Sequence, residues 1–523
     1  MNRWNKTQNS LRNVGVAIAA YFAITFFAFL DRTIFIRLLS ADYLGLNGLF
    51  SNILSMLSLA ELGVGSAIAY SLYAPLDSGN ISMVQAIMRL YKKIYCIIGS
   101  IVLLLGAALT PFLPWLIKDI PTDMPDIYTY YLLYVLNVGS SYFFTYKRTL
   151  IICDQKQYIS TVTSTLSSIL TSLLRMGILL LVHNYLFYLI VGIVATIGEN
   201  IVISVMADRM YPYLRTKEIQ SLPKETTICI RKNIYAMFCH KIGNVVVNCT
   251  DNLIISRFVG LAAVGLYSNY TLILSKVSGL LGKFFSSVTA SVGMLALDKD
   301  KSHVEQVLYR MLFLNFWMYA FSCIGFFCLV QPFIRLWVGS EYQLSIWVVL
   351  VAVLNFYLSG MRQTVLTFRD AAGVFWYDRY KALIESAVNV VLSIPLAMKF
   401  GISGVLLGTI GSTLLVPFWY DGYILFRHLF HKGIGKYLRR QLFYGTLALA
   451  AGCITWYLCR QVSGGKIEAF LLQIVICIIV PNIMFFLVLC KSREWSYYRE
   501  LFQDLWNKGK KKIKCKLFRD YRN

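Results

Sequence analysis

The sequence predicts an all-α polytopic membrane protein of fourteen transmembrane helices, with two six-helix lobes related by a pseudo-two-fold axis along the membrane normal, plus two C-terminal helices. Three observations predict it: an apolar composition, long apolar runs between short charged loops, and an internal repeat. The chain has 523 residues, 57% hydrophobic and 15% charged, with a mean hydropathy of +0.61. A water-soluble globule could not bury so much apolar surface.

Each predicted helix is an apolar run of about 20 residues or more, enough to cross the hydrocarbon core of a bilayer. The first run follows three basic residues and has no small-residue cleavage site at its end, so we interpret it as an uncleaved helix. The fourteen predicted helices span residues 13–38, 44–75, 93–117, 127–151, 157–182, 185–208, 233–258, 264–297, 304–335, 345–368, 381–399, 402–426, 441–459 and 468–490.

The net charge of +24 is distributed between the apolar runs rather than gathered on a soluble domain. If the N-terminus is cytoplasmic, alternate loops and both tails receive most of the 50 Lys and Arg residues, whereas the opposite loop at residues 118–126 is acidic. By the positive-inside rule, both termini are predicted to be cytoplasmic. Because the positive-inside rule accounts for the basic residues, nucleic acid is not predicted as a partner. The twelve cysteines show no metal-ligand spacing, so no metal site is predicted.

An internal repeat is present at an offset of 220 residues. Residues 31–55 align without gaps over 251–275, with eight identical pairs that include Asp31 with Asp251 and Gly45 with Gly265. The offset joins helices 1 and 7 and helices 2 and 8, which preserves their orientation in the membrane and predicts parallel lobes. The predicted parts are an N-lobe (1–208), a cytoplasmic linker (209–232), a C-lobe (233–426), a second linker (427–440), helices 13 and 14 (441–490) and a basic tail (491–523).

Charged residues inside the apolar runs are the candidates for function, because a charge in the hydrocarbon costs a few kcal/mol or more and usually faces a cavity or a partner. His240, Asn244, Asn248 and Asp251 share one face of predicted helix 7, beside Lys241, and Lys276 and Lys283 share a stripe of helix 8. The sequence leaves several readings open. The lysines contact a substrate or pair with Glu61 or Glu199; Asp31 and Asp251 line a site or cap helix ends near Arg37 and Arg257.

Two stretches resemble a known family. YLGLNGLFSNILSMLSLAELGVGSAIAYSLYAPL (43–76) and TDNLIISRFVGLAAVGLYSNYTLI (250–273) are similar to the Wzx-type flippases of O-antigen, capsule and exopolysaccharide synthesis, within the multidrug/oligosaccharidyl-lipid/polysaccharide (MOP) exporter superfamily. The resemblance covers roughly residues 10–430. It implies two bundles in a V around a central cavity. It also implies transport of undecaprenyl-diphosphate-linked glycan units across the bacterial cytoplasmic membrane, from the inner to the outer leaflet, by alternating access.

A diphosphate that crosses a membrane needs cations in a hydrated cavity, and sugar hydroxyls need amide and hydroxyl partners. Besides the lipid-linked glycan, membrane lipids and the polysaccharide polymerase machinery are expected partners. No cofactor is expected beyond a coupling Na⁺ or H⁺, between which the sequence does not decide. The candidates are Lys276, Lys283, Lys241, Arg32 and Arg175 for the diphosphate, Asn244, Asn248, Asn269 and Tyr270 for the glycan, and Glu61, Asp251 and Glu199 as ion-coupling or structural carboxylates.

Two other classes of protein are weighed against the flippase. An ion-coupled drug exporter of the same superfamily usually has twelve helices and an acidic network in one lobe, whereas the second lobe here is cationic. A membrane-embedded polysaccharide polymerase or glycosyltransferase would need a large outer loop or paired carboxylates near the outer surface, and the outer loops here are short. With no nucleophile, metal or phosphate-loop constellation, the chain is not predicted to be an enzyme.

Overall fold

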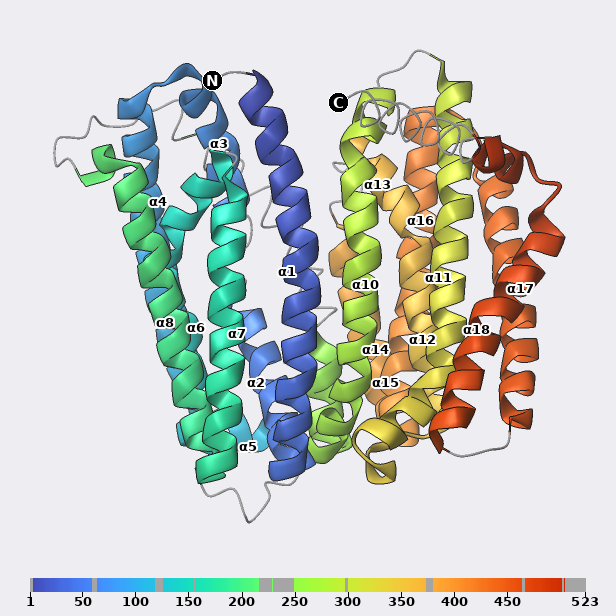
Figure 1. Cartoon of the computed structure of the whole chain (residues 1–523), viewed down its shortest axis with the longest axis horizontal. Coiled ribbons are helices and arrows are strands. Elements are labelled where there is room, and N and C mark those ends of the chain that lie inside the picture. The colour runs from blue at the N-terminus through green and yellow to red at the C-terminus, as the bar shows by residue number, and fades with distance from the viewer. Residues whose placement is uncertain are drawn as a thin grey trace, which may run out of the picture. The chain divides into compact units, whose positions relative to one another are not determined.

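The computed structural model consists of helices throughout the residues that it describes (Figure 1). The description covers residues 3–58, 64–117, 126–154, 156–215, 228, 249–296, 300–372, 380–462, 466–500 and 503. Within these residues, ten helices are long and apolar enough to cross a membrane. The protein is therefore a multi-pass membrane protein, while the number of fourteen spans and the orientation of the termini stay predictions.

The elements of the first half are α1 (Arg3–Leu38), α2 (Ala41–Leu57), α3 (Val64–Ser78), α4 (Ile81–Ala108), a 3₁₀ turn (Thr110–Phe112), α5 (Leu113–Leu116), α6 (Ile127–Cys153), α7 (Gln157–Val182), α8 (Tyr185–Met210) and a 3₁₀ turn (Pro212–Arg215). Three of these helices, α6, α7 and α8, agree within two residues with the predicted runs, whereas α4 starts twelve residues before the predicted run 93–117. Side-chain caps explain two of the starts, because Asn80 Oδ1 accepts from Met83 N at 3.0 Å and Asn184 Oδ1 accepts from Leu186 N at 2.8 Å. The predicted helix 44–75 was wrong as one element, since α2 ends at Leu57.

The second half begins, in the described residues, with a helical segment at 249–258. The elements that follow are α10 (Leu261–Ala296), α11 (Lys301–Trp337), a 3₁₀ turn (Ser340–Tyr342), α12 (Ile346–Met361), α13 (Gln363–Ala372), α14 (Lys381–Phe400), α15 (Ile402–Leu415), α16 (Pro417–Leu425), a π-helical turn (Phe426–Phe430), α17 (Gly435–Gln461) and α18 (Lys466–Leu489).

Two predicted helices of this half are each divided in the structure. The run 345–368 forms α12 and α13, separated at Arg362, whose Nε donates to Asp421 Oδ2 of α16 at 3.0 Å. The run 402–426 is divided before Pro417, which has no N–H to donate and therefore starts α16. Apolar periodicity alone misses such breaks because both sides of each break are equally apolar.

The order of the helices repeats along the chain at the spacing found in the sequence. Helices α2 and α10 start at Ala41 and Leu261, and α4 and α11 start at Ile81 and Lys301, so each pair is 220 residues apart. The helix pattern thus supports the internal repeat. The symmetry of two lobes in space and the lobe boundaries stay predictions.

By its contacts the chain forms two compact units, which we describe separately. Unit 1 contains residues 1–272 and 379–412, and unit 2 contains residues 273–378 and 413–523. In unit 1, α1 packs along α7, and α6 packs between α4 and α8 (Figure 1). In unit 2, α11 packs against α12, α17 and α18, and Phe316 of α11 stacks on Tyr444 of α17 with 4.4 Å between ring centroids.

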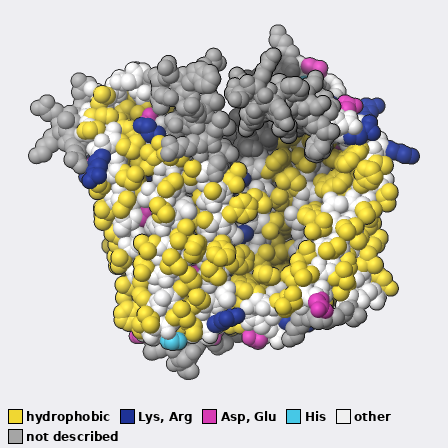
Figure 2. Space-filling model, in the orientation of Figure 1, with side chains coloured by type: hydrophobic (Ala, Val, Ile, Leu, Met, Phe, Trp, Pro, Cys, Tyr) yellow, Lys and Arg dark blue, Asp and Glu magenta, His cyan; other side chains and the backbone are white. Residues whose placement is uncertain are grey.

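Large apolar side chains cover the outer surfaces of the helices (Figure 2). Leu181 of α7 is 83% exposed, Leu104 of α4 is 72% exposed and Leu442 of α17 is 71% exposed. A water-soluble protein rarely exposes contiguous apolar surface of this extent, whereas lipid acyl chains solvate it well. The surface therefore agrees with the composition in indicating a membrane environment.

The two halves of the repeat contact each other reciprocally within unit 1. A Cβ atom at Gly45 of α2 would lie 2.1 Å from the backbone oxygen of Leu261, and one at Gly265 of α10 would lie 2.0 Å from the backbone oxygen of Ala41. Ala41 and Leu261 are themselves equivalent in the repeat, as are the two glycines. The first turns of α2 and α10 thus cross at backbone contact, which only glycine at both positions permits.

Candidate functional site

A buried polar cluster lies in unit 1 around Arg32, near the end of α1 opposite the N-terminus. Arg32 Nε donates to Asn269 Oδ1 of α10 at 2.9 Å, and its Nη2 donates to Ser268 Oγ. Asn269 is fully buried, and its Nδ2 has no hydrogen-bond partner among the described residues. The guanidinium therefore joins α1 to α10 through neutral acceptors instead of a carboxylate.

Arg175 of α7 brings a second guanidinium to the same cluster. Its Cζ lies 4.5 Å from the centre of the Tyr188 ring on α8, a distance typical of a cation–π contact. Gly192 of α8 makes room for it, because a Cβ there would lie 2.0 Å from Arg175 Nη2. Arg175 Nε is buried and has no hydrogen-bond partner in the described part of the chain. The guanidinium is thus held by packing and retains an unused donor.

Asp31 is the acidic member of this cluster. Tyr188 donates its hydroxyl hydrogen to Asp31 Oδ2 at 3.1 Å, while Asp31 Oδ1 is buried without a partner among the described residues. The interpretation of Asp31 as a capping residue beside Arg37 was wrong, since its carboxylate faces Tyr188 from within α1. Two guanidinium groups against one carboxylate leave the cluster with an excess positive charge, which water or an anion must solvate.

A small cavity of about 80 Å³ adjoins Arg175. Its lining is polar on one side, where Tyr134 donates to Asn47 Oδ1 at 2.5 Å and lies 3.3 Å from the hydroxyl of Tyr185. Asn137 Oδ1, also at the cavity, is buried without a partner in the described residues. The volume is sufficient for a few water molecules. In this conformation, the cavity therefore hydrates Arg175 but is too small for a glycan.

The second carboxylate of the repeat, Asp251, lies in a different environment within unit 1. Thr409 Oγ1 of α15 donates to Asp251 Oδ1 at 3.1 Å, and Asn389 Nδ2 of α14 donates to Thr409 Oγ1 at 3.0 Å. Thr250 Oγ1 and Ser412 Oγ lie 3.3 Å and 3.5 Å from the Asn389 amide. No Lys or Arg pairs with Asp251 among the described residues, and its carboxylate and the Thr409 hydroxyl are oxygen ligands of the kind that bind small hard cations.

The other predicted residues lie as follows. Lys276 and Lys283 are both partly buried on the part of α10 that belongs to unit 2. Tyr270 is 1% exposed. Glu199 accepts from Arg148 at 2.6 Å and from Ser164 at 2.8 Å within unit 1, and its pairing with the helix 8 lysines stays a prediction. Glu61, His240, Lys241, Asn244 and Asn248 lie outside the described residues.

Sequence reasoning missed the uncharged members of both groups. Tyr134, Tyr185 and Tyr188 are aromatic residues in aromatic-rich helices, and the sequence gives no sign that distinguishes them from packing residues. Asn389, by contrast, is a buried amide in the apolar run of α14, and a polar residue within such a run was a usable signal.

The fold is shared with known transporters. No protein-family model and no curated protein matched the sequence. A solved structure of the lipid II flippase MurJ, in an inward closed conformation, matches with a TM-score of 0.61 and 17% identity over 94% of this chain and 100% of that chain. An inward-facing MATE-family multidrug resistance transporter of the MOP superfamily matches with a TM-score of 0.57 and 14% identity, over 76% and 93%. A mutant of the Vibrio cholerae MATE transporter VcmN matches with 0.56 and 14%, over 83% and 99%.

These matches show that the chain has the fold of MOP-superfamily transporters, and they confirm the predicted fold at that level. Because the sequence identities are below 20%, these matches show only the fold.

Proposed function

We propose that the chain is a Wzx-type flippase, which moves undecaprenyl-diphosphate-linked glycan units from the inner to the outer leaflet of the bacterial cytoplasmic membrane. The observation that carries the proposal is the excess of buried guanidinium over carboxylate at Arg32, Arg175 and Asp31. A cation without an anionic partner is costly among apolar helices and is retained where it binds an anion. Guanidinium groups suit a diphosphate because their fork of N–H donors matches phosphate oxygens.

Arg32 links binding of the anion to movement in this proposal. Its N–H groups are bound to Ser268 and Asn269 of α10, both neutral acceptors. A phosphate oxygen is a stronger acceptor, so a headgroup that reaches Arg32 would replace these bonds and loosen α1 from α10. Substrate would then bind the separated arrangement better than the joined one. Such differential binding is the requirement for alternating access.

We propose further that Asp251 holds the coupling cation. An ionised carboxylate buried without a basic partner requires a bound cation or a proton. Thr409 of α15 supplies a hydroxyl oxygen beside it, and the Asn389 amide of α14 holds that hydroxyl in place. A Na⁺ ion at this position would join Asp251 to Thr409, whereas a proton would need only the carboxylate. We favour Na⁺ over H⁺ because the Thr409 hydroxyl oxygen lies beside the carboxylate as a second oxygen ligand.

Replacing Asp251 by Asn should abolish the stimulation of transport by Na⁺, because the amide removes the charge that the cation neutralises. Thr409→Val should weaken Na⁺ binding about tenfold, the loss expected for one ligand near 1.4 kcal/mol. The measurement is ²²Na⁺ binding and transport into proteoliposomes with and without Na⁺. Asp126→Asn, at an exposed site without a capping bond, should leave both unchanged. If Na⁺ still stimulates transport by Asp251→Asn, Asp251 does not hold the coupling cation.

The proposed function is tested by the lipid-linked glycan itself. Cells that lack the protein should accumulate polyprenyl-diphosphate-linked glycan on the inner leaflet, and the purified protein in liposomes should move this lipid to the opposite leaflet. No accumulation, together with sensitivity to organic cations, would instead favour a drug exporter. Lengthening or cleavage of the glycan by the purified protein would replace the flippase by a polymerase or glycosyltransferase.

A further inference from the structure

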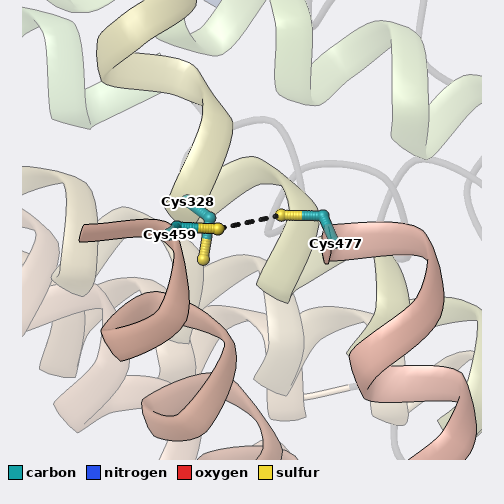
Figure 3. Close-up of side chains that lie close together, drawn as sticks. All are labelled: Cys328, Cys459 and Cys477. Atoms are coloured by element: carbon teal, nitrogen blue, oxygen red, sulfur yellow. Dashed lines mark hydrogen bonds between the residues drawn. The ribbon is translucent and has the colours of Figure 1, made fainter. Parts of the chain in front are cut away.

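Three buried cysteines from three helices meet in unit 2 (Figure 3). Cys328 comes from α11, Cys459 from α17 and Cys477 from α18, and their sulfur atoms all lie within 4.8 Å of one another. The Sγ atoms of Cys459 and Cys477 are 3.8 Å apart. None of the three is in a disulfide. The arrangement places three thiols at one point of a helix-packed core.

The packing of the helices fixes this arrangement. Helices α11, α17 and α18 each pack against the other two, and the three cysteines belong to one apolar core cluster. Gln473, one turn before Cys477 on α18, donates its Nε2 to the backbone oxygen of Cys459 at 3.1 Å. This bond fixes the register of α17 against α18 near the sulfurs. Gln473 Oε1 is buried without a hydrogen-bond partner among the described residues. An amide oxygen without a hydrogen bond in the described part of the chain therefore lies on the same face of α18 as Cys477.

We propose that these three cysteines form a binding site for a soft d¹⁰ metal cation, with Cu(I) the ion that fits best. Three sulfur ligands around one ion, at a metal–sulfur distance of about 2.3 Å, place the sulfur atoms about 4.0 Å apart in a trigonal plane. The observed 3.8 Å agrees with that separation. A disulfide would use two sulfurs at about 2.05 Å and leave the third without a role.

The surroundings favour an ion of low charge and low coordination number. Thiolate ligands select Cu(I) and Zn(II) among biological metals, and structural Zn(II) is almost always four-coordinate. Each thiol that becomes a thiolate releases one proton, and an apolar core favours the complex with the least net charge. Cu(I) reaches a neutral complex with one thiolate and two thiols, which releases one proton, whereas Zn(II) needs two thiolates and releases two protons. The bound ion would link α17 and α18 to α11, independently of the proposed transport.

The test is metal binding by the full-length protein in detergent, with Cu(I) under reducing conditions and Zn(II) in separate arms. We expect one ion per chain after desalting, and its loss in the variant Cys328→Ser, Cys459→Ser, Cys477→Ser. The matched control is Cys323→Ser, Cys453→Ser, Cys490→Ser, which changes three cysteines on or beside the same three helices and should keep the ion. The arm that binds identifies the metal.

A second measurement holds even if the triple variant folds poorly. X-ray absorption of the loaded wild-type protein should show sulfur neighbours at about 2.3 Å, and the ion should protect these three cysteines, but not Cys453, from alkylation. A variant with Val at the three positions keeps an apolar core and should also lose the ion. Binding of neither metal by the wild type, or equal binding by both triple-serine variants, would overturn the site.

Discussion

Replacing Arg175 by Gln should reduce transport of the lipid-linked glycan at least about tenfold, because a hydrogen bond to a charged group contributes about 1.5–3 kcal/mol. Arg175 has a buried donor without a partner in the described residues, and a cavity beside it. Gln removes the charge that a diphosphate requires. Arg175→Lys keeps the charge but loses the planar fork and should transport at an intermediate rate. The measurement is leaflet exchange of the glycan lipid in proteoliposomes.

Gly192 offers a control that retains the charge of Arg175. In Gly192→Ala, the new methyl group would displace the end of a flexible side chain, so the guanidinium should move while the fold stays stable. Transport should therefore fall although thermal unfolding is unchanged. Gly198→Ala, on the same helix with no atom within 4 Å of its added Cβ, should transport like the wild type. Wild-type transport by Arg175→Gln would show that this guanidinium does not bind the substrate.

The two halves of the repeat have kept a carboxylate at one position and changed its neighbours. Asp31 faces Tyr188 and a pair of arginines, while Asp251 faces Thr409 and Asn389. The first arrangement suits an anion and the second suits a cation. Under the proposed function, substrate and coupling ion would therefore occupy equivalent positions of the two halves without competing for the same group.

The sequence predicted most helices, because apolar length and charged boundaries determine where a chain crosses a membrane. It also named Arg32, Arg175 and Asp251 as candidates, since an ionisable residue within an apolar run is conspicuous. It did not predict that Arg32 contacts Asn269, or that Gly192 makes room for Arg175, because both depend on how distant helices pack. For the same reason it predicted no metal site, since Cys328, Cys459 and Cys477 lack the spacing of a metal motif and meet only through tertiary packing.

Gly45→Ala should destabilise the protein by about 2 kcal/mol or more, within the range of an overpacked core or above it. The added Cβ would lie 2.1 Å from the backbone oxygen of Leu261, and a backbone atom cannot move aside as the end of a side chain can. Helices α2 and α10 must then separate or shift. Gly265→Ala should have an effect of similar size, because its Cβ would meet the backbone oxygen of Ala41 at 2.0 Å.

Alanine substitutions at two other glycines of α2 and α10 serve as controls for a general effect of alanine on helix stability. Gly48→Ala, one turn along α2, would meet only side chains, Val264 at 3.3 Å and Asn252 at 3.8 Å, and Gly282→Ala on α10 would meet nothing within 4 Å. Both should unfold at or slightly above the wild-type temperature, since alanine favours a helix over glycine by about 1 kcal/mol. Thermal unfolding in detergent compares the four variants. Equal unfolding temperatures for Gly45→Ala and Gly48→Ala would show that α2 and α10 do not cross at backbone contact. The reciprocal packing of the two halves of the repeat would then be wrong.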